Sequence, residues 1–139
     1  MTKTKTILIK TNGSGLYEFT DELRTWVSGD GILHLFLKHT SASLLIQENF
    51  DPEVKTDLSN FFKRLVPVAS DPSMSYLTHR YEGEDDMPAH IKASLGQVSL
   101  AIPVISGELA LGSWQGVYLF EHRKARKNRE VVAKLQGDR

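Results

Sequence analysis

A run of acidic residues followed by a proline and a histidine is the part of this chain with the clearest potential for chemistry. Four of the five residues from Glu82 to Asp86 are carboxylates, Pro88 favours a helix start, and His90 follows Asp86 by four positions. Side chains at this spacing share one face of a helix, so Asp86 and His90 can contact each other or one cation. Because clustered carboxylates repel one another, the run predicts something that offsets their charge: a cation, a basic substrate group or a helix N-terminus.

The same acids also have a purely structural interpretation, which stays open. We expect a short helix over residues 89–95, and Asp86 lies three residues before its start, where a carboxylate can cap the helix. The other acids of the run are then left without a structural role. This surplus favours a functional role for at least one of them.

Histidines are the second set of candidate groups. His34 lies among apolar residues in a predicted strand and is interpreted as a packed or surface strand histidine. His39, His79, His90 and His122 lie in loops or at element ends, each within a polar motif. Imidazole is the commonest metal ligand in proteins, but no pair here has zinc-finger or HExxH spacing. A metal site would therefore be assembled from distant segments; the alternative is that these are ordinary surface histidines.

Further polar groups lie at the ends of predicted strands. Glu48 and Asn49 follow an apolar strand, where they form either a strand-exit turn or a carboxylate and an amide that project into a pocket. In the segment 111–116, two glycines allow tight turns or close approach of a ligand, and Trp114 either packs in the core or stacks on a flat ring. Arg123 has the planar, forked guanidinium that binds phosphate through two hydrogen bonds.

Composition narrows the class of protein. The chain has 139 residues, enough for one domain, residues 1–139, with a sizeable core. It contains no Cys, so neither disulfides nor thiolate chemistry are available, and a cytoplasmic location is expected. No apolar run reaches the ~20 residues that span a bilayer, so no membrane partner is expected. The net charge of zero gives no support to nucleic-acid binding.

The pattern of apolar residues and turn signals predicts an α+β domain built around sheet packing. Helices are expected to begin at Thr20, as the N-cap, and at Asp51-Pro52, with Pro67 ending the second one. The polar segment 67–86 is long for a loop inside a compact domain, which is typical of a functional loop or of a disordered segment. The predicted strands are residues 4–11, 32–37, 44–46, 98–104, 108–111, 116–120 and, with a helix as the alternative, 131–135.

Four motifs follow one another along the chain: His39–Asn49 leading to Asp51-Pro52, Asp85–Lys92, Leu111–Gly116 and Glu121–Arg123. In this order they resemble the YjbQ-type family, which is also labelled secondary thiamine-phosphate synthase. The resemblance covers essentially the whole chain. It implies an α+β fold with an antiparallel β-sandwich and two or three helices, assembled as a homotrimer.

The resemblance also implies an activity, the joining of a pyrimidine pyrophosphate to a thiazole phosphate with release of pyrophosphate. Such a reaction needs a divalent cation, Mg²⁺ or Zn²⁺, to neutralise the departing pyrophosphate. On this interpretation, Asp85 or Asp86 holds the metal together with His79, His90 or His122. The expected partner is therefore a phosphorylated small molecule.

The remaining roles are assigned on the same resemblance. Thr40, Ser41 and Arg123 are expected to contact phosphate, and Trp114 to stack on the pyrimidine. No Gly-rich phosphate loop precedes a helix in this chain, so a non-enzymatic, metabolite- or metal-binding trimer stays open as the alternative. The full candidate set is His39, Glu48, Asp85 and Asp86 as catalytic groups; Thr40, Ser41, Asn49, Trp114, Gln115 and Arg123 for substrate; and His79, His90 and His122 for metal.

Overall fold

The structure, a computed structural model, describes residues 1–138. Within them the chain forms eight strands, three α-helices and one 3-10 helix. No helix in this range is long and apolar enough to cross a membrane. In chain order the elements are β1 (Thr2–Asn12), β2 (Gly15–Glu18), α1 (Thr20–Trp26), β3 (Gly31–Leu37), β4 (Ala42–Glu48), α2 (Pro52–Leu65), the 3-10 helix η1 (Pro72–Met74), α3 (Asp86–Leu95), β5 (Ser99–Ile105), β6 (Glu108–Leu109), β7 (Gln115–Glu121) and β8 (Arg126–Gly137).

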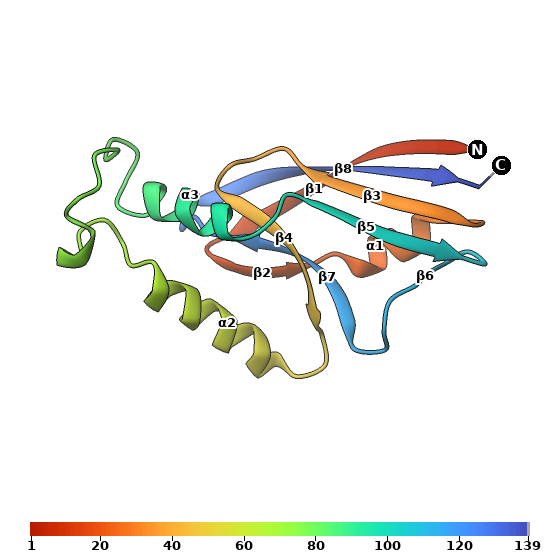
Figure 1. Ribbon diagram of the computed structural model, residues 1–139, viewed down its shortest axis with the longest axis horizontal. Helices are drawn as coiled ribbons and strands as arrows, with labels where there is room; N and C mark the ends of the chain where they lie inside the picture. Colours follow the sequence, from red (N-terminus) through yellow and green to blue (C-terminus); the bar gives the residue numbers. More distant parts are fainter. Residues whose placement is uncertain (139) are drawn as a thin grey trace.

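The strands form two antiparallel sheets, and the predicted α+β class is confirmed. One sheet has the order β1-β8-β3-β5-β6 and the other the order β2-β7-β4. Figure 1 shows β1, β8 and β3 in one layer and β2 and β7 in the other, with α2 and the following segment extending beyond one end. Strands distant in sequence, such as β1 and β8, pair along their whole length.

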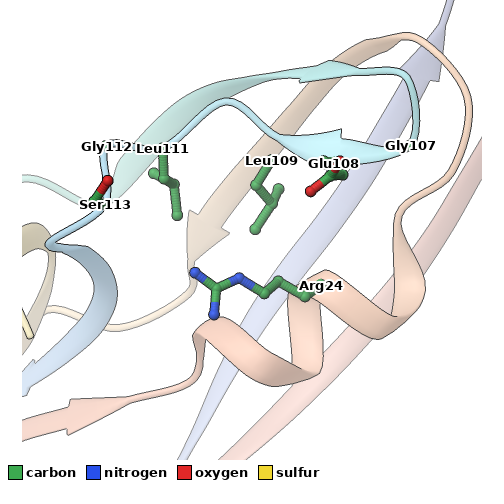
Figure 2. A pocket seen from close by; sticks show the side chains of 7 residues that line it. All are labelled: Arg24, Gly107, Glu108, Leu109, Leu111, Gly112 and Ser113. Carbon is green, nitrogen blue, oxygen red and sulfur yellow. The ribbon is translucent and has the colours of Figure 1, made fainter.

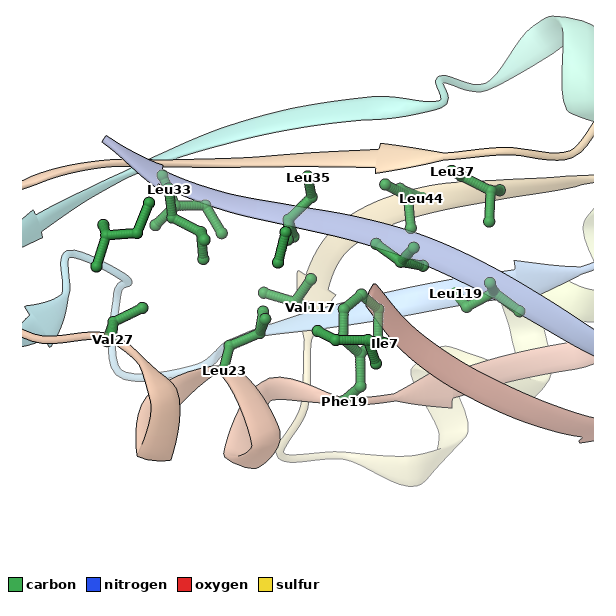
Figure 3. Packing of buried hydrophobic residues seen from close by; sticks show 14 of the residues in the cluster. Ile7, Phe19, Leu23, Val27, Leu33, Leu35, Leu37, Leu44, Val117 and Leu119 are labelled. Atoms are coloured by element: carbon green, nitrogen blue, oxygen red, sulfur yellow. The ribbon is translucent and has the colours of Figure 1, made fainter. Parts of the chain in front are cut away.

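The core lies between the two sheets and follows from strand periodicity. Along β3, Leu33, Leu35 and Leu37 are buried while Ile32, His34 and Phe36 are exposed, as the alternation predicts. Figure 3 shows these leucines in one cluster with Leu44, Val117 and Leu119 of the other sheet, and Leu23 of α1 belongs to the same cluster. His34 is therefore a surface strand histidine on the outer face, in agreement with its structural interpretation.

Several predicted boundaries are wrong, for local physical reasons. The strand β2 is not predicted from the sequence, which indicates only a turn before Thr20; pairing with β7 makes it a strand. Thr20 is the first residue of α1 rather than its N-cap, and its hydroxyl donates to Glu18 Oε2 (2.7 Å) and accepts from the Val117 amide (2.8 Å). Residues 131–135 belong to β8, as expected for a strand.

The helix α3 also begins earlier than predicted, at Asp86 instead of Ala89. Pro88 is then its third residue, which the first turn tolerates because amides there have no partner within the helix. The segment between α2 and α3 contains η1 and packs a second small apolar cluster, formed by Val66, Ala69, Met74 and Leu77. This cluster anchors the segment between α2 and α3, in which the sequence predicts no helix or strand.

A buried ion pair joins the ends of β1, β7 and β8. The Glu121 carboxylate is fully buried and accepts hydrogen bonds from Arg129 Nε (2.8 Å) and from the Thr11 hydroxyl (2.6 Å). Its other oxygen accepts from the backbone amides of His122 (3.1 Å) and Arg123 (3.2 Å). The Glu121 carboxylate therefore fixes the backbone of His122 and Arg123, the two residues that follow β7. Arg123 is the residue whose side chain contacts the acidic run.

We predict that Glu121→Gln lowers the free energy of unfolding by about 3 kcal/mol, because it leaves the buried Arg129 charge without a counter-ion. Urea unfolding monitored by circular dichroism measures the change. The control is Glu22→Gln, which removes only a solvent-exposed pair with Lys5 at 3.5 Å and should cost less than about 1 kcal/mol. Equal losses in the two variants would contradict the role assigned to Glu121.

Candidate functional site

The acidic run does not simply cap the helix that follows it. Asp85 occupies the N-cap position of α3 without a side-chain hydrogen bond to the helix, and Asp86 is the first helical residue. The Asp86 side chain is almost fully buried, with 4% of its surface exposed. Its carboxylate points toward two histidines and an arginine instead of toward the free amides of the helix. The structural interpretation, in which Asp86 caps the helix, is therefore wrong.

Three of the predicted ligands meet at one point: His79, Asp86 and His90. His79 Nε2 lies 2.8 Å and His90 Nε2 lies 3.3 Å from Asp86 Oδ2. One ligand atom from each residue falls within 4.8 Å of the other two. The expected Asp86–His90 contact across one helical turn is present, and the 67–86 segment adds His79 from outside the helix.

The orientation of His90 creates an electrostatic conflict at this point. His90 Nδ1 lies 2.9 Å from the Thr40 carbonyl oxygen, which can only accept, so Nδ1 carries the proton. In the neutral imidazole, Nε2 then presents a lone pair to Asp86 Oδ2, which also presents lone pairs. Two acceptors at this distance repel unless a proton or a cation is shared between them. The geometry therefore suits either an imidazolium or a bound cation.

Arg123 fixes the two aspartates from the other side. Its Nε donates to Asp85 Oδ2 (3.1 Å), one terminal nitrogen donates to Asp86 Oδ1 (2.7 Å) and the other to the Glu82 carbonyl oxygen (2.9 Å). The guanidinium thus occupies one oxygen of Asp86 and leaves Oδ2 to face the histidines. Arg123, predicted to bind phosphate, is engaged with the acidic run in this structure.

Both aspartates are held in the ionised form. Burial raises the pKa of the Asp86 carboxyl, but the hydrogen bond to His79, the charge of the His90 ring when it is protonated and the charge of Arg123 outweigh it, so the pKa lies below its usual value. Burial likewise opposes ionisation of Asp85, and the Lys124 amide and Arg123 outweigh that effect and lower the pKa. The site therefore presents carboxylates, not carboxylic acids, at neutral pH.

The connection between β3 and β4 supports this group without belonging to it. His39 Nε2 accepts from the Glu130 amide (2.8 Å), so its ring ties the connection to β8. Burial and the Arg129 charge lower the pKa of His39, which favours the neutral ring that this hydrogen bond requires. Ser41 Oγ accepts from Arg129 (2.9 Å). Thr40, between them, is exposed and supplies the carbonyl that orients His90.

His122 lies apart from the three-residue group. Its ring is buried, contacts Ser43 Oγ through Nε2 at 3.1 Å and lies 4.5 Å, centroid to centroid, from Phe120. Burial, followed by the nearby Lys92 charge, lowers the pKa of the imidazole to about 4. In this structure the predicted metal ligand is a neutral, packed histidine.

Another set of predicted residues lies at the far end of β4. Asn49 donates to Glu18 Oε2 (3.2 Å), and Glu48 accepts from the Asp51 amide (3.2 Å). Trp114 packs on the Phe50 ring, with centroids 4.6 Å apart. Gln115 Oε1 accepts from the Gly112 amide (2.7 Å). The seven residues of β4 separate Glu48 from the connection at its start by about 20 Å at strand spacing, so this set and the histidine group lie at opposite ends of one strand.

The residues that sequence reasoning missed are the supporting ones. Glu121 and Arg129 are buried and hold the chain on either side of the site. Glu18 and Ser43 contact predicted site residues, although nothing in the local sequence distinguishes them. A usable signal existed for Glu121, because it ends the apolar run of β7 and an acid there needs a buried partner.

With this geometry established, comparison with known proteins identifies the family. Residues 5–138 match the family model described as UPF0047 protein YjbQ-like. This chain belongs to the YjbQ-like UPF0047 family. UPF0047 protein YjbQ of Salmonella typhimurium is 45% identical over 139 residues, covering 96% of this chain and 97% of its own length. A UPF0047 protein of Synechocystis is 44% identical over 136 residues, covering 95% and 90% respectively.

Two solved structures share the fold. A conserved hypothetical protein from Thermus thermophilus superposes with a TM-score of 0.82 at 31% identity, covering 95% of this chain and 99% of its own. An uncharacterised conserved protein of the YjbQ/UPF0047 family from Clostridium acetobutylicum gives 0.80 at 30% identity, covering 95% and 99%. The names of these four relatives state no activity, so the comparisons establish family and fold.

The buried His122 predicts a pH dependence of stability. Its native pKa of about 4 lies below the usual 6.5, so between these values the unfolded state binds a proton that the native state does not. This part of the stability is therefore present above pH 6.5 and is lost as pH falls toward 4.

We expect the loss to reach about 2 kcal/mol between about pH 7 and pH 5. His122→Gln, which keeps a polar atom near Ser43, should not show this component. Urea unfolding of both proteins at the two pH values measures it as the change in their difference, which removes the shared titration of the carboxylates. A difference that stays constant with pH would contradict the assignment of a neutral, buried His122.

Proposed function

We propose that this protein is a divalent-metal-dependent enzyme acting on a phosphorylated small molecule, with thiamine phosphate formation as the specific reaction to test. One observation carries the proposal: His90 Nε2 and Asp86 Oδ2 face each other as two acceptors beside His79. A cation between them removes the repulsion and gains three ligands. The resemblance to secondary thiamine-phosphate synthases supports the choice of reaction.

The donor set fits a metal of the first transition series better than it fits Mg²⁺. Two imidazole nitrogens and one carboxylate oxygen are typical ligands of catalytic Zn²⁺, whereas Mg²⁺ favours oxygen donors and water. The separations of 2.8 and 3.3 Å from Asp86 Oδ2 are close to those between neighbouring ligands of a metal with bonds of about 2.0–2.1 Å. Of the two metals expected from the sequence, we therefore propose Zn²⁺.

The contacts around the three ligands resemble those that orient metal ligands in general. The Thr40 carbonyl holds His90 through Nδ1, and Arg123 holds the Asp86 oxygen that does not face the histidines. Side-chain exposures of 43% for His79 and 30% for His90 leave the group open to an incoming substrate. A closed structural site would be buried on all sides, so this openness favours catalysis or reversible binding.

When bound, the metal would neutralise the charge that builds up on a departing pyrophosphate. In the proposed reaction a thiazole nitrogen forms a bond to the pyrimidine methylene carbon as the carbon–oxygen bond to pyrophosphate breaks. Thr40, exposed beside His90, is our candidate for a phosphate contact. Arg123 is engaged with three groups of the acidic run, so we assign it a positioning role.

The engagement of Arg123 also favours a second candidate function, non-enzymatic binding of a metal or a metabolite. An enzyme that acts on phosphorylated substrates needs free cationic groups to bind them, and this guanidinium donates all of its described hydrogen bonds to the protein. In both candidate functions the three-residue group binds the metal. Only the enzyme also converts a bound substrate into product.

We predict that His90→Gln lowers Zn²⁺ affinity by at least about tenfold, since it removes one of three ligands, and abolishes thiamine phosphate formation. Isothermal titration of metal-stripped protein measures the affinity, and chromatographic detection of the product measures turnover. His34→Gln, on the exposed face of β3, is the matched control and should change neither.

The outcomes separate the candidates. Loss of both properties in His90→Gln supports the enzyme. Loss of Zn²⁺ binding together with no product from the wild type supports the binding protein. Unchanged Zn²⁺ affinity in His90→Gln would show that the three-residue group is not the metal site.

We also propose that the chain assembles as a homotrimer, as its resemblance to the family implies. The helix α2 has a strongly apolar face, yet none of its residues is buried within residues 1–138 of one chain. Phe61 and Leu65 of α2 are 57% and 53% exposed, and Leu95 of α3 is 58% exposed. Burying such side chains against a neighbouring copy would stabilise an oligomer.

We expect a native mass about three times that of one 15.6 kDa chain, measured by light scattering after size exclusion. Phe61→Asp should shift the mass toward that of a monomer, because it places a charge in the proposed contact. Asn60→Asp, on an exposed position of the same helix, is the control. A monomeric wild type would rule out the trimer, and a trimeric Phe61→Asp would rule out this face as its contact.

A further inference from the structure

A cavity of about 440 Å³ lies between α1 and the segment that connects β6 to β7. Its volume is within the roughly 300–1,000 Å³ range of small-molecule sites. Figure 2 shows Arg24 reaching into it from α1, while Leu109 and Leu111 line it from the opposite wall. Figure 1 places β6 and α3 at opposite ends of the molecule, so this cavity is separate from the histidine group.

Both rims of the cavity are held by hydrogen bonds. At one rim, the turn between β5 and β6 has positive φ at Ser106 (51°) and Gly107 (81°) and is tied to the loop after α1. The Ser106 amide donates to Asp30 Oδ1 (2.8 Å), and the Gly107 amide donates to the Gly29 carbonyl (2.7 Å). The cavity therefore does not depend on a free loop at this end.

The other rim is closed by a small turn before β7. The Gly112 amide donates to Gln115 Oε1 (2.7 Å), and the Gln115 amide donates to the Gly112 carbonyl (3.1 Å). Gln115 is thus occupied in shaping the cavity wall. Because both rims are fixed, the backbone around the cavity is pre-formed. Binding of a ligand would therefore cost little conformational entropy in the backbone.

Two opposite charges line the cavity without pairing with each other. Among residues 1–138, the only ion pair of Arg24 is with Asp21 at 3.3 Å, and Glu108 forms none. The Asp21 side chain is 94% exposed, so its ion pair with Arg24 is weak. Figure 2 shows the guanidinium on the side of Leu111 and Ser113, with Glu108 on the other side of Leu109.

Two leucines lie on the cavity wall between these charges. Leu109 and Leu111 are partly buried, pack against the main core and also line the cavity. Ser113 adds a hydroxyl on the side of the guanidinium. The cavity therefore has a cationic end, an aliphatic middle and an anionic end.

We propose that this cavity binds a small aliphatic zwitterion, a molecule that carries a carboxylate and an ammonium at separate positions on an apolar body. The carboxylate contacts Arg24 and the Ser113 hydroxyl, the ammonium contacts Glu108, and the aliphatic body packs on Leu109 and Leu111. A guanidinium recognises a carboxylate through paired hydrogen bonds, and each charged contact adds specificity at its own end. The site is independent of the proposed metal centre.

A probe with matched half-analogues tests both ends of the site. The probe is 6-aminohexanoate; hexanoate lacks its ammonium and hexylamine lacks its carboxylate. Isothermal titration of the full chain with each compound should show the zwitterion binding at least about tenfold more tightly than either analogue. Failure of 6-aminohexanoate to bind saturably up to about 10 mM, or binding no tighter than that of an analogue, would overturn the proposal.

Two isosteric variants assign the ends. Arg24→Gln should lower the affinity for 6-aminohexanoate to about that for hexylamine, and Glu108→Gln should lower it to about that for hexanoate. Lys134→Gln and Glu53→Gln change the net charge equally at exposed positions elsewhere and should leave binding unchanged. Circular dichroism verifies the fold of each variant. Equal effects of the cavity variants and their controls would overturn the assignment, because they would indicate a response to net charge alone.

Discussion

The buried carboxylate of Glu121 is the interaction on which the geometry of the candidate site depends. It has no exposed surface and satisfies its oxygens with Arg129, Thr11 and the backbone amides of the two residues that follow it. A charge in this position is tolerated only when it is fully paired, so β1, β7 and β8 must meet in one arrangement. The chain then leaves β7 in the direction that brings Arg123 onto Asp85 and Asp86.

From this point, polar contacts extend on two sides toward the three-residue group. Arg129 reaches Ser41 in the connection between β3 and β4, and the neighbouring carbonyl of Thr40 orients His90. On the other side, Arg123 takes one oxygen of Asp86. The result is that Asp86 Oδ2 and His90 Nε2 face each other at 3.3 Å. A shared proton or a cation between these two atoms would stabilise this arrangement.

Local rules account well for some elements and fail at others. The alternation along residues 32–37 matches the buried and exposed faces of β3, because strand periodicity and burial agree there. The i, i+4 spacing correctly brought Asp86 and His90 together. The strand β2 was missed, because only pairing with β7 makes its four residues a strand. The start of α3 was misplaced, because Asp86 forms tertiary contacts with His79 and Arg123 instead of capping the helix.

The sequence by itself determined the α+β class, the family resemblance and the acid–histidine pairing on one helix, since each depends on residue type and short-range spacing. Only the tertiary structure decided which candidates meet. It joined His79 and Arg123 to Asp86, buried His122 against Ser43, and left Glu48 and Trp114 at the other end of β4. It also placed Arg24 opposite Leu109 in a cavity that no local sequence pattern predicts. Such meetings follow from sheet order and from burial of charge, which join segments more than a hundred residues apart, as Thr11 and Glu121 show.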